Sequence, residues 1–333
     1  MTRQLAVGID LGGTNIVTAL IADDGDIIGI VTRRTDAGRG AERVVGEMAD
    51  TVNDLIAQNS VSPDDVVGLG IGTPGPLRLS KGFIHRSANL PGWENVPIRQ
   101  WLQDKTELPV QLENDANAAA YAEHWVGAGK GAGDLVTLTL GTGIGAGAII
   151  DGEILRGHFE NAAEFGHTIV ELDGRPCSCG QRGCLEQYAS PGNIAKYAIE
   201  QIRKGSKSSL GPVLKANGAF DSQAIAEAAQ AGDALADTIW DEACRYIALA
   251  CVNIQHTVNP EILVLAGGMS KSGDFLLGRV RRHFTAQTWK IFEDKPRIVL
   301  SNLGGNAGVI GAAGLAWKAH RSGSACLNIA AAE

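Results

Sequence analysis

Long apolar runs and an excess of positive charge are both missing from this sequence. No stretch of the 333 residues approaches the ~20 consecutive apolar residues that a membrane-spanning helix needs. Lysine and arginine number 29 against 37 aspartates and glutamates, and the net charge of −8 disfavours sequence-independent binding to nucleic acid. Residues 1–4 run directly into an apolar strand pattern, without a signal-peptide profile. We therefore expect a cytoplasmic protein whose partners are neither nucleic acid nor membranes.

A P-loop lysine motif is also absent, so a phosphate site in this chain would need a different structure. Glycine is abundant instead, with 43 residues, and hydrophobic residues make up 44% of the chain. This composition is typical of a globular α/β protein rich in turns. The length is sufficient for one large domain or two of ordinary size.

Two glycine bends follow apolar strand patterns in different parts of the chain. Strand, bend, strand and acidic turn follow one another over residues 5–26, and the same order recurs over residues 135–153. Backbone N–H groups in such a bend can bind phosphate oxygens without a lysine. The residues concerned are Gly12, Gly13, Thr14 and Asn15 in the first bend and Gly141, Thr142 and Gly143 in the second. Residues 141–146 also fit a loose dinucleotide-binding pattern, but that pattern must open a helix, and here a strand follows.

Two aspartates stand at strand ends where a ligand could lie. Asp10 precedes the first bend and could hold a magnesium ion through water, or it could turn back onto its own loop. Asn114 and Asp115 end a short strand pattern ahead of an alanine-rich helix. An acidic residue at a helix start most often caps free N–H groups. Because this strand end lies next to the boundary between the two repeats, Asp115 could instead face a ligand.

Three further segments each allow a binding role and a structural one. Gly75 lies in a Pro-Gly bend after the strand pattern 66–71, where open α/β sheets place ligand loops. Asn89 lies in an irregular segment that ends at Trp93 and reads as a surface loop. The pair Gly267-Gly268, between a strand and a helix, could admit a nucleoside or only permit close packing.

One cluster of cysteine and histidine has the spacing of a metal site. Cys177, Cys179 and Cys184 are spaced C-x-C-x4-C and follow His167. Three thiolates and one imidazole complete a tetrahedral zinc shell with no position for water, which is typical of a structural site. A set of buried or disulfide-bonded cysteines is the alternative. Two further cysteines, Cys244 and Cys251, fit a helix core, and Cys326 lies in a weakly patterned tail. Glu164 and Glu186 bracket the cluster and could accept hydrogen bonds from a polar ligand.

These motifs resemble the ROK family of sugar kinases and sugar-responsive repressors. The resemblance is carried by E-x-G-H at 164–167, by C-x-C-G-x-x-G-C-x-E at 177–186 and by both glycine bends. It implies an actin-like ATPase fold (ribonuclease H-like), an α/β architecture of two duplicated domains with a cleft between them. The glucokinase branch is the most similar, which implies transfer of phosphate from ATP to the 6-hydroxyl of glucose. Magnesium, a structural zinc and a homodimer or homotetramer would accompany that activity.

Residue roles follow from the resemblance position by position. The family residue matching Asp115 is the catalytic base, and those matching Asn114, Glu164, His167 and Glu186 contact the sugar. An N-L-x-x-W element places Asn89 beside the sugar, and Gly75 is expected there too. One imidazole nitrogen of His167 would bind zinc and the other would reach the sugar. Asn15 departs from the family, many of whose members carry lysine there, and this bears on nucleotide binding or on the choice of phosphoryl donor.

Three alternatives remain open at this point. The substrate could be another hexose, such as N-acetylmannosamine or fructose, because the hydroxyl acceptors would be similar. The chain could be a repressor, although the first strand pattern begins at Leu5 and the charge is acidic. It could also be a sugar sensor without catalysis, against which Asp115 and both bends argue.

The domain prediction assigns residues 1–114 and 304–320 to a smaller α/β domain and residues 115–303 to a larger one with the zinc loop. Residues 321–333 are expected to form a mobile tail. Helices are predicted at 41–58, 191–203 and 234–258, and residues 204–221 are predicted to be an exposed connection.

Overall fold

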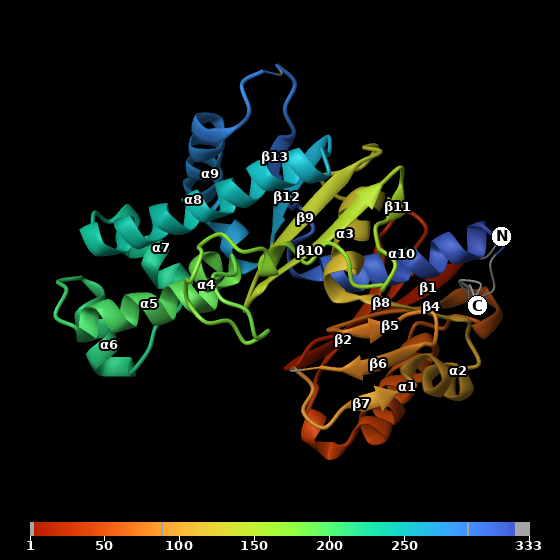
Figure 1. Ribbon diagram of the computed structural model, residues 1–333. Helices are drawn as coiled ribbons and strands as arrows, with labels where there is room; N and C mark the ends of the chain where they lie inside the picture. Colours follow the sequence, from red (N-terminus) through yellow and green to blue (C-terminus); the bar gives the residue numbers. More distant parts are fainter. Residues whose placement is uncertain (1–2, 88, 292, 324–333) are drawn as a thin grey trace. The chain divides into compact units, whose positions relative to one another are not determined.

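The computed structural model describes residues 3–87, 89–291 and 293–323 (Figure 1). Two compact units are present, which we call the first and second units. The first contains residues 1–131, 147–163 and 305–333, and the second contains residues 132–146 and 164–304. The predicted boundary at residue 114 falls inside the first unit, because helix α3 (Asp115–Trp125) packs against helix α10 (Ala307–Arg321).

A five-stranded sheet in the order β3-β2-β1-β4-β8 forms the centre of the first unit. Its central strand β1 pairs antiparallel with β2 and parallel with β4, and β8 extends the parallel part. The strands are β1 (Leu5–Leu11), β2 (Asn15–Ala22), β3 (Ile27–Arg34), β4 (Val66–Thr73) and β8 (Val110–Asn114). The parallel strands are almost wholly buried, as their continuous apolar sequences predict.

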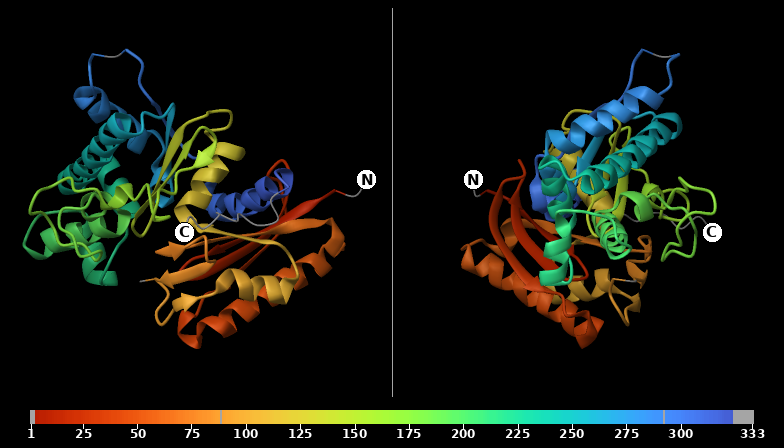
Figure 2. Two further views of the ribbon diagram at one scale, coloured as in Figure 1. Left: turned by 45° about the vertical axis from the view of Figure 1, so that its right-hand side comes forward. Right: turned by 90° about the vertical axis from the view of Figure 1, so that its left-hand side faces the viewer.

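Helices cover both faces of this sheet (Figure 2). Helices α10 and α3 lie on one face, and α1 (Ala41–Gln58) and α2 (Ile98–Thr106) lie on the other. The backbone of α10 approaches so closely that a Cβ atom on Gly70 would come within 1.7 Å of the Ala312 carbonyl oxygen. Helix α1 has the predicted bounds, since its larger apolar residues recur at helical spacing and are buried.

A small antiparallel sheet, β5-β6-β7, follows β4 and was not predicted. It consists of β5 (Leu77–Arg78), β6 (Phe83–Arg86) and β7 (Glu94–Val96). The segment before β7 was predicted to be a surface loop, but part of it is buried. Leu90 and Trp93 are buried, and the Trp93 indole N–H donates to the Ala37 carbonyl oxygen at 3.3 Å, while Asn89 is exposed.

The second sheet has the order β11-β10-β9-β12-β13. Its strands are β9 (Leu135–Leu140), β10 (Ile144–Ile150), β11 (Glu153–Ile154), β12 (Ile262–Ala266) and β13 (Arg297–Leu300). Strand β12 is parallel to both β9 and β13. The helices that follow in the second unit are α4 (Glu186–Ala189), α5 (Pro191–Arg203), α6 (Leu210–Asn217), α7 (Ser222–Gln230), α8 (Ala234–Thr257) and α9 (Asp274–Gln287). Short 3-10 helices occupy Ala37–Arg39, Pro63–Asp65, Phe165–His167, Gly268–Ser272 and Gly304–Asn306.

The two sheets have the same design, in which antiparallel strands joined by a glycine bend precede parallel strands. This repetition confirms the duplicated ribonuclease H-like fold expected from the sequence. The prediction that 204–221 is only a connection was wrong, because α6 lies within it. The lysines, serines and glycines of this segment concealed a short helix that buries only Leu210.

The predicted tail begins at residue 321, where α10 ends, and residues 324–333, with Cys326, lie outside the described residues. Cys244 and Cys251 are buried within α8, as expected. Over the described ranges no helix combines the length and the apolarity needed to cross a bilayer.

Candidate active site

The carboxyl ends of the parallel strands in the first unit bring Asp10 and Asp115 close together. Asp10 lies near the end of β1 opposite Gly72 of β4, and a Cβ atom on Gly72 would lie 3.5 Å from the Cα atom of Asp115. Both aspartates are half-buried. Burial and the negative charge of Asp115 raise the pKa of Asp10 to about 6. Burial also raises the pKa of Asp115, although a hydrogen bond from the Ala116 N–H opposes this effect.

Helix capping at this position is performed by Asn114. Its Oδ1 atom accepts hydrogen bonds from the N–H groups of Ala116 at 3.0 Å and Asn117 at 3.2 Å. Asp115 is the first residue of α3, and its carboxylate accepts the Ala116 N–H at 2.9 Å and also interacts with the Asn114 side chain. The cap fixes the Asn114 amide so that its Nδ2 atom points toward Gly75, where an added Cβ atom would lie 3.8 Å away. Asn114 therefore accepts both capping N–H groups, while the Asp115 carboxylate shares only the Ala116 N–H and keeps acceptor capacity for a ligand.

Asp10 also lies against the start of α10. A Cβ atom on Gly308 would come within 2.4 Å of the Asp10 Oδ2 atom, so only glycine fits at that position of the helix. Helix N-termini favour negative charge. A half-buried carboxylate beside a second carboxylate is a chemically suitable donor for a divalent cation, because a cation would offset the repulsion between them. These residues therefore fit the magnesium ion expected from the sequence.

The first glycine bend connects β1 to β2 beside this pair. Gly12 donates its N–H to the Asn15 carbonyl oxygen at 2.9 Å, and the Thr35 hydroxyl donates to the Gly12 carbonyl oxygen at 2.6 Å. Gly13 packs against Asn89, since a Cβ atom on Gly13 would lie 2.8 Å from the Asn89 carbonyl oxygen. Gly13, Thr14 and Asn15 are exposed. The bend thus has the rigid base and open rim that a phosphate site needs.

The second bend, between β9 and β10, directly contacts Glu186. The Ile144 N–H donates to the Glu186 Oε2 atom at 3.0 Å, and a Cβ atom on Gly143 would come within 2.2 Å of that oxygen. Gly141 donates its N–H to the Gly143 carbonyl oxygen at 3.0 Å. From the sequence, Glu186 was expected to bind the sugar and this bend to bind phosphate. The structure brings the two together, so that one N–H of the bend already binds a carboxylate.

The two glycines after β12 differ in role: Gly267 permits close packing, and Gly268 leaves space for a ligand. Gly267 has φ of 88°, and an added Cβ atom would come within 2.5 Å of the Leu140 carbonyl oxygen. Glycine is therefore required at position 267, because the backbone there packs closely against the end of β9. Gly268 has no atom within 4 Å of an added Cβ, so the space above it is open to a ligand.

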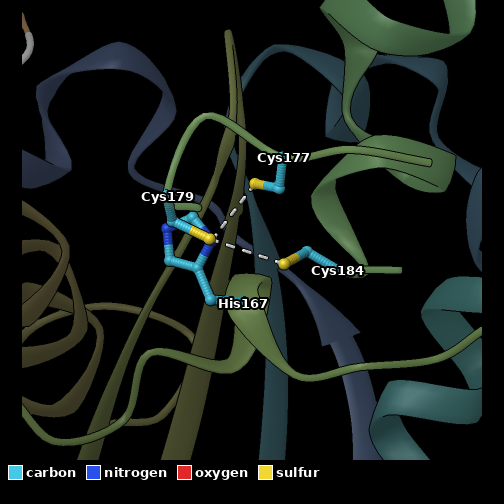
Figure 3. Close-up of side chains that lie close together, drawn as sticks. All are labelled: His167, Cys177, Cys179 and Cys184. Carbon is cyan, nitrogen blue, oxygen red and sulfur yellow. Dashed lines mark hydrogen bonds between the residues drawn. The ribbon is translucent and has the colours of Figure 1, made fainter. Parts of the chain in front are cut away.

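Figure 3 shows the side chains of His167, Cys177, Cys179 and Cys184 directed toward one another. Their ligand atoms all lie within 4.8 Å of one another. The Nδ1 atom of His167 faces the cluster, at 3.8 Å from the Cys177 Sγ atom, which leaves Nε2 for another partner. The Cys179 and Cys184 sulfur atoms are 3.6 Å apart, and these cysteines are free. The alternative of a disulfide is therefore not observed here, and the donor set fits a tetrahedral zinc ion.

The protonation of these thiols is unequal. Burial opposes ionisation of Cys177, but hydrogen bonds from the Cys179 backbone and from neighbouring side chains, including Gln187, outweigh it and lower its pKa to about 7. Burial, together with the neighbouring Cys179 and Cys177, raises the pKa of Cys184 to about 12. Three sulfurs crowded without a positive charge repel one another once ionised, and a divalent metal would supply that charge.

Arginine and tyrosine side chains anchor the cysteine loop to the helices behind it. The Arg175 guanidinium lies 4.6 Å from the ring centroid of Tyr188 and 4.3 Å from that of Tyr197. The Tyr246 hydroxyl donates to the Glu171 carboxylate at 2.7 Å. Gln187 and Arg175 were not predicted from the sequence. Arg175 lies two residues before Cys177 and Gln187 directly follows Glu186, and this proximity to the cysteine motif was the available signal.

Within the first unit the structure gathers six predicted site positions around the ends of β1, β4 and β8: Asp10, Gly13, Gly75, Asn89, Asn114 and Asp115. Within the second unit it gathers the second bend, Glu186, Gly267 and the His167 turn. A Cβ atom on Gly166, next to His167, would come within 1.9 Å of the Ile144 carbonyl oxygen. Glu164 is exposed and immediately precedes that turn.

Comparison with known proteins identifies one family over nearly the whole chain. The model of the ROK family matches residues 6–319. A glucokinase of Halalkalibacterium halodurans is 36% identical over 312 residues, which cover 93% of this chain and 94% of that protein. The crystal structure of a ROK family glucokinase from Streptomyces griseus, in complex with glucose and AMPPNP, is 32% identical. It has a TM-score of 0.80 and covers 94% of this chain and 99% of its own. A xylose repressor of Caldicellulosiruptor bescii is 30% identical over 310 residues, which cover 92% of this chain and 76% of the repressor.

Proposed function

The chain belongs to the ROK family, and from this premise we propose that it is an ATP-dependent hexose kinase of the glucokinase type. It transfers the γ-phosphoryl group of ATP to the 6-hydroxyl of glucose. The observation that supports this most strongly is that Asn114, and not Asp115, is the N-cap residue of α3. Asn114 accepts both capping N–H groups, so the half-buried Asp115 carboxylate, which shares only the Ala116 N–H, is not required as the cap. A regulator that only binds sugar has no need of such a group.

Asp115 acts as the general base in this proposal. Its carboxylate accepts the proton of the sugar hydroxyl as that oxygen bonds to the γ-phosphorus, while the bond from phosphorus to the bridging oxygen breaks and ADP leaves. The raised pKa of Asp115 makes its carboxylate a stronger base than an exposed aspartate. General-base catalysis contributes on the order of 10²- to 10⁴-fold to rate, and the remainder comes from positioning and charge stabilisation.

In this proposal the sugar hydroxyls are assigned to the groups that the family resemblance indicates. The Asn114 Nδ2 atom donates to one hydroxyl, since Oδ1 is occupied by the helix cap. Glu164, Glu186 and the Nε2 atom of His167 bind other hydroxyls, and Asn89 and the Gly75 turn border the same sugar. Such groups give selectivity, because a sugar that lacks the matching hydroxyl leaves a polar group unpaired.

The bends bind the ATP phosphates, and Gly268 borders the nucleoside. Asp10 would hold magnesium, and when bound this ion would neutralise charge on the phosphates. The exposed side chain of Asn15 offers an amide in place of a cation at the rim of the first bend. We therefore expect a weaker contact with phosphate here than in family members that carry lysine.

Zinc has a structural role in the proposal. Ligation by His167, Cys177, Cys179 and Cys184 leaves no open position, so the metal holds the loop between Glu164 and Glu186 and fixes the tautomer of His167. We also propose a homodimer or homotetramer, which light scattering on the purified protein would test.

A panel of hexoses with ATP and magnesium tests the proposal against its closest alternatives. Glucose should be phosphorylated most efficiently, judged by kcat/KM. Better turnover of N-acetylmannosamine or fructose would assign the chain to another hexose. The similarity to a xylose repressor keeps a sugar-responsive regulator as the second candidate, and sugar binding without any phosphoryl transfer would favour it.

A further inference from the structure

A buried carboxylate next to the proposed base is saturated with hydrogen bonds. Glu113, at the end of β8, is fully buried. Its Oε1 atom accepts the Asn114 N–H at 2.9 Å and the Asn117 Nδ2–H at 3.0 Å. Its Oε2 atom accepts the Arg156 Nε–H at 2.8 Å and lies 2.8 Å from the Arg156 Nη2 atom. The Glu113 carboxylate thus binds the backbone of Asn114, the residue whose side-chain amide caps α3.

The orientation of Asn117 shows how strongly this contact is favoured. Its Nδ2 atom donates to Glu113, and as a result its buried Oδ1 atom has no hydrogen-bond partner among the described residues. An unpaired buried acceptor is unfavourable, so the interaction with Glu113 must outweigh that cost. The same residue donates its backbone N–H to the Asn114 cap. Glu113, Asn114 and Asn117 therefore form one hydrogen-bonded unit around the first turn of α3.

Arg156 belongs to a compact loop, residues 156–162, which also supports the Gly75 turn. The Ala162 N–H donates to the Arg156 carbonyl oxygen at 3.0 Å and closes the loop. Glu160 accepts the Ser80 N–H at 2.9 Å, and Asn161 accepts the Leu77 N–H at 3.4 Å, two residues after Gly75. One loop of the first unit thus contacts both segments that carry its proposed sugar-binding groups, the Asn114-Asp115 junction and the Gly75 turn.

We infer that Arg156 is a positioning residue for phosphoryl transfer, which acts through Glu113 to hold Asn114 and Asp115 in their working geometry. Because the Glu113 carboxylate binds both Arg156 and the Asn114 N–H, a shift of this carboxylate would also displace the Asn114 backbone. Arg156 itself is more than half-buried, with 18% of its side chain exposed, and both of its donor atoms converge on one oxygen. The inference rests on the proposed function, because it assigns a role within the proposed reaction.

Arg156→Lys is the sharpest test, because lysine keeps the charge that Glu113 requires but loses the planar pair of donors. Misplacement of reacting groups by about 1 Å can reduce rate by about 10²-fold. We therefore expect kcat for the hexose to fall about 10- to 100-fold, with KM for ATP within about twofold of wild type. The ratio of hexose phosphorylation to wasteful ATP hydrolysis should also fall, which a simple loss of folded protein would not produce.

Arg39→Lys is the matched control. Arg39 makes a two-pronged ion pair with Glu47 in the same unit, at 2.8 and 2.6 Å, but both side chains are about one-third exposed. This variant should retain wild-type kcat and the same phosphorylation ratio. Should Arg156→Lys fail to fold, the double variant Glu113→Gln/Arg156→Met removes both buried charges at similar volume. It should fold and still show the lowered kcat.

The outcomes separate the two claims. If wild type and Arg39→Lys are active and folded Arg156→Lys retains full kcat, the positioning role is wrong while the kinase assignment stands. Full activity in the double variant would likewise overturn the positioning role. If wild type transfers no phosphoryl group to any hexose, the proposed function is wrong and the role of Arg156 falls with it.

Discussion

Replacing Asp115 with asparagine should remove catalysis without weakening the fold. Asn114 makes both capping hydrogen bonds to α3, at 3.0 and 3.2 Å, and these remain when the Asp115 carboxylate, which shares the Ala116 N–H, is replaced. The substitution also removes a charge that burial disfavours, so the free energy of unfolding at pH 7 should stay level or rise. The loss of a general base should lower kcat on the order of 10²- to 10⁴-fold. Binding of the hexose should persist, because an asparagine side chain still offers a hydrogen-bond acceptor.

Three measurements on the same samples check this prediction. Steady-state kinetics give kcat, calorimetric titration gives hexose affinity, and urea unfolding gives stability. The control is Asn114→Ala, which should lower the free energy of unfolding by about 0.5–2 kcal/mol because it removes the helix cap. If Asp115→Asn lost that stability while kcat stayed near wild type, Asp115 would be the structural residue and the reasoning would be refuted.

Further predictions concern the metal cluster, the second bend and pH. Cys177→Ala should reduce zinc from about one ion per chain, by elemental analysis, and should loosen the cysteine loop toward proteases; full zinc content would contradict the assigned ligands. Glu186→Gln should strengthen ATP binding without sugar, since it removes a negative charge from the second bend, and calorimetry showing unchanged or weaker binding would argue against this. Because the folded-state pKa of Asp10 is raised to about 6, its contribution to stability is fully present below about pH 4 and is lost as pH rises through about 6. The loss should be about 2–3 kcal/mol without magnesium, and Asp10→Asn should abolish it in urea titrations across this range.

Features with local sequence patterns were predicted well. The bounds of α1 and α5 followed from apolar residues at helical spacing, and the clustering of His167 with three cysteines followed from cysteines close together in the chain. The repeated order of strand, bend and strand was enough to predict two sheets of one design. In each case the structure depends on residues that are close together in the chain, so the pattern can be recognised from the sequence alone.

Features that depend on distant partners were not visible. Strands β5 to β7 are too short for an alternating pattern, and they form a sheet only because they pair with one another. The contact between Glu113 and Arg156 joins segments far apart in the chain, so neither residue stood out. The choice of cap between Asn114 and Asp115 was likewise undecidable, because both residue types cap helices and only the backbone path selects one.

Steady-state phosphorylation of glucose by the purified wild-type protein, with ATP and magnesium and with the product identified by phosphorus NMR, tests the central claim most directly. The account predicts one glucose 6-phosphate for each ADP released, and no phosphate ester from Asp115→Asn within the same time. Glucose that binds but remains unphosphorylated by wild type would contradict it.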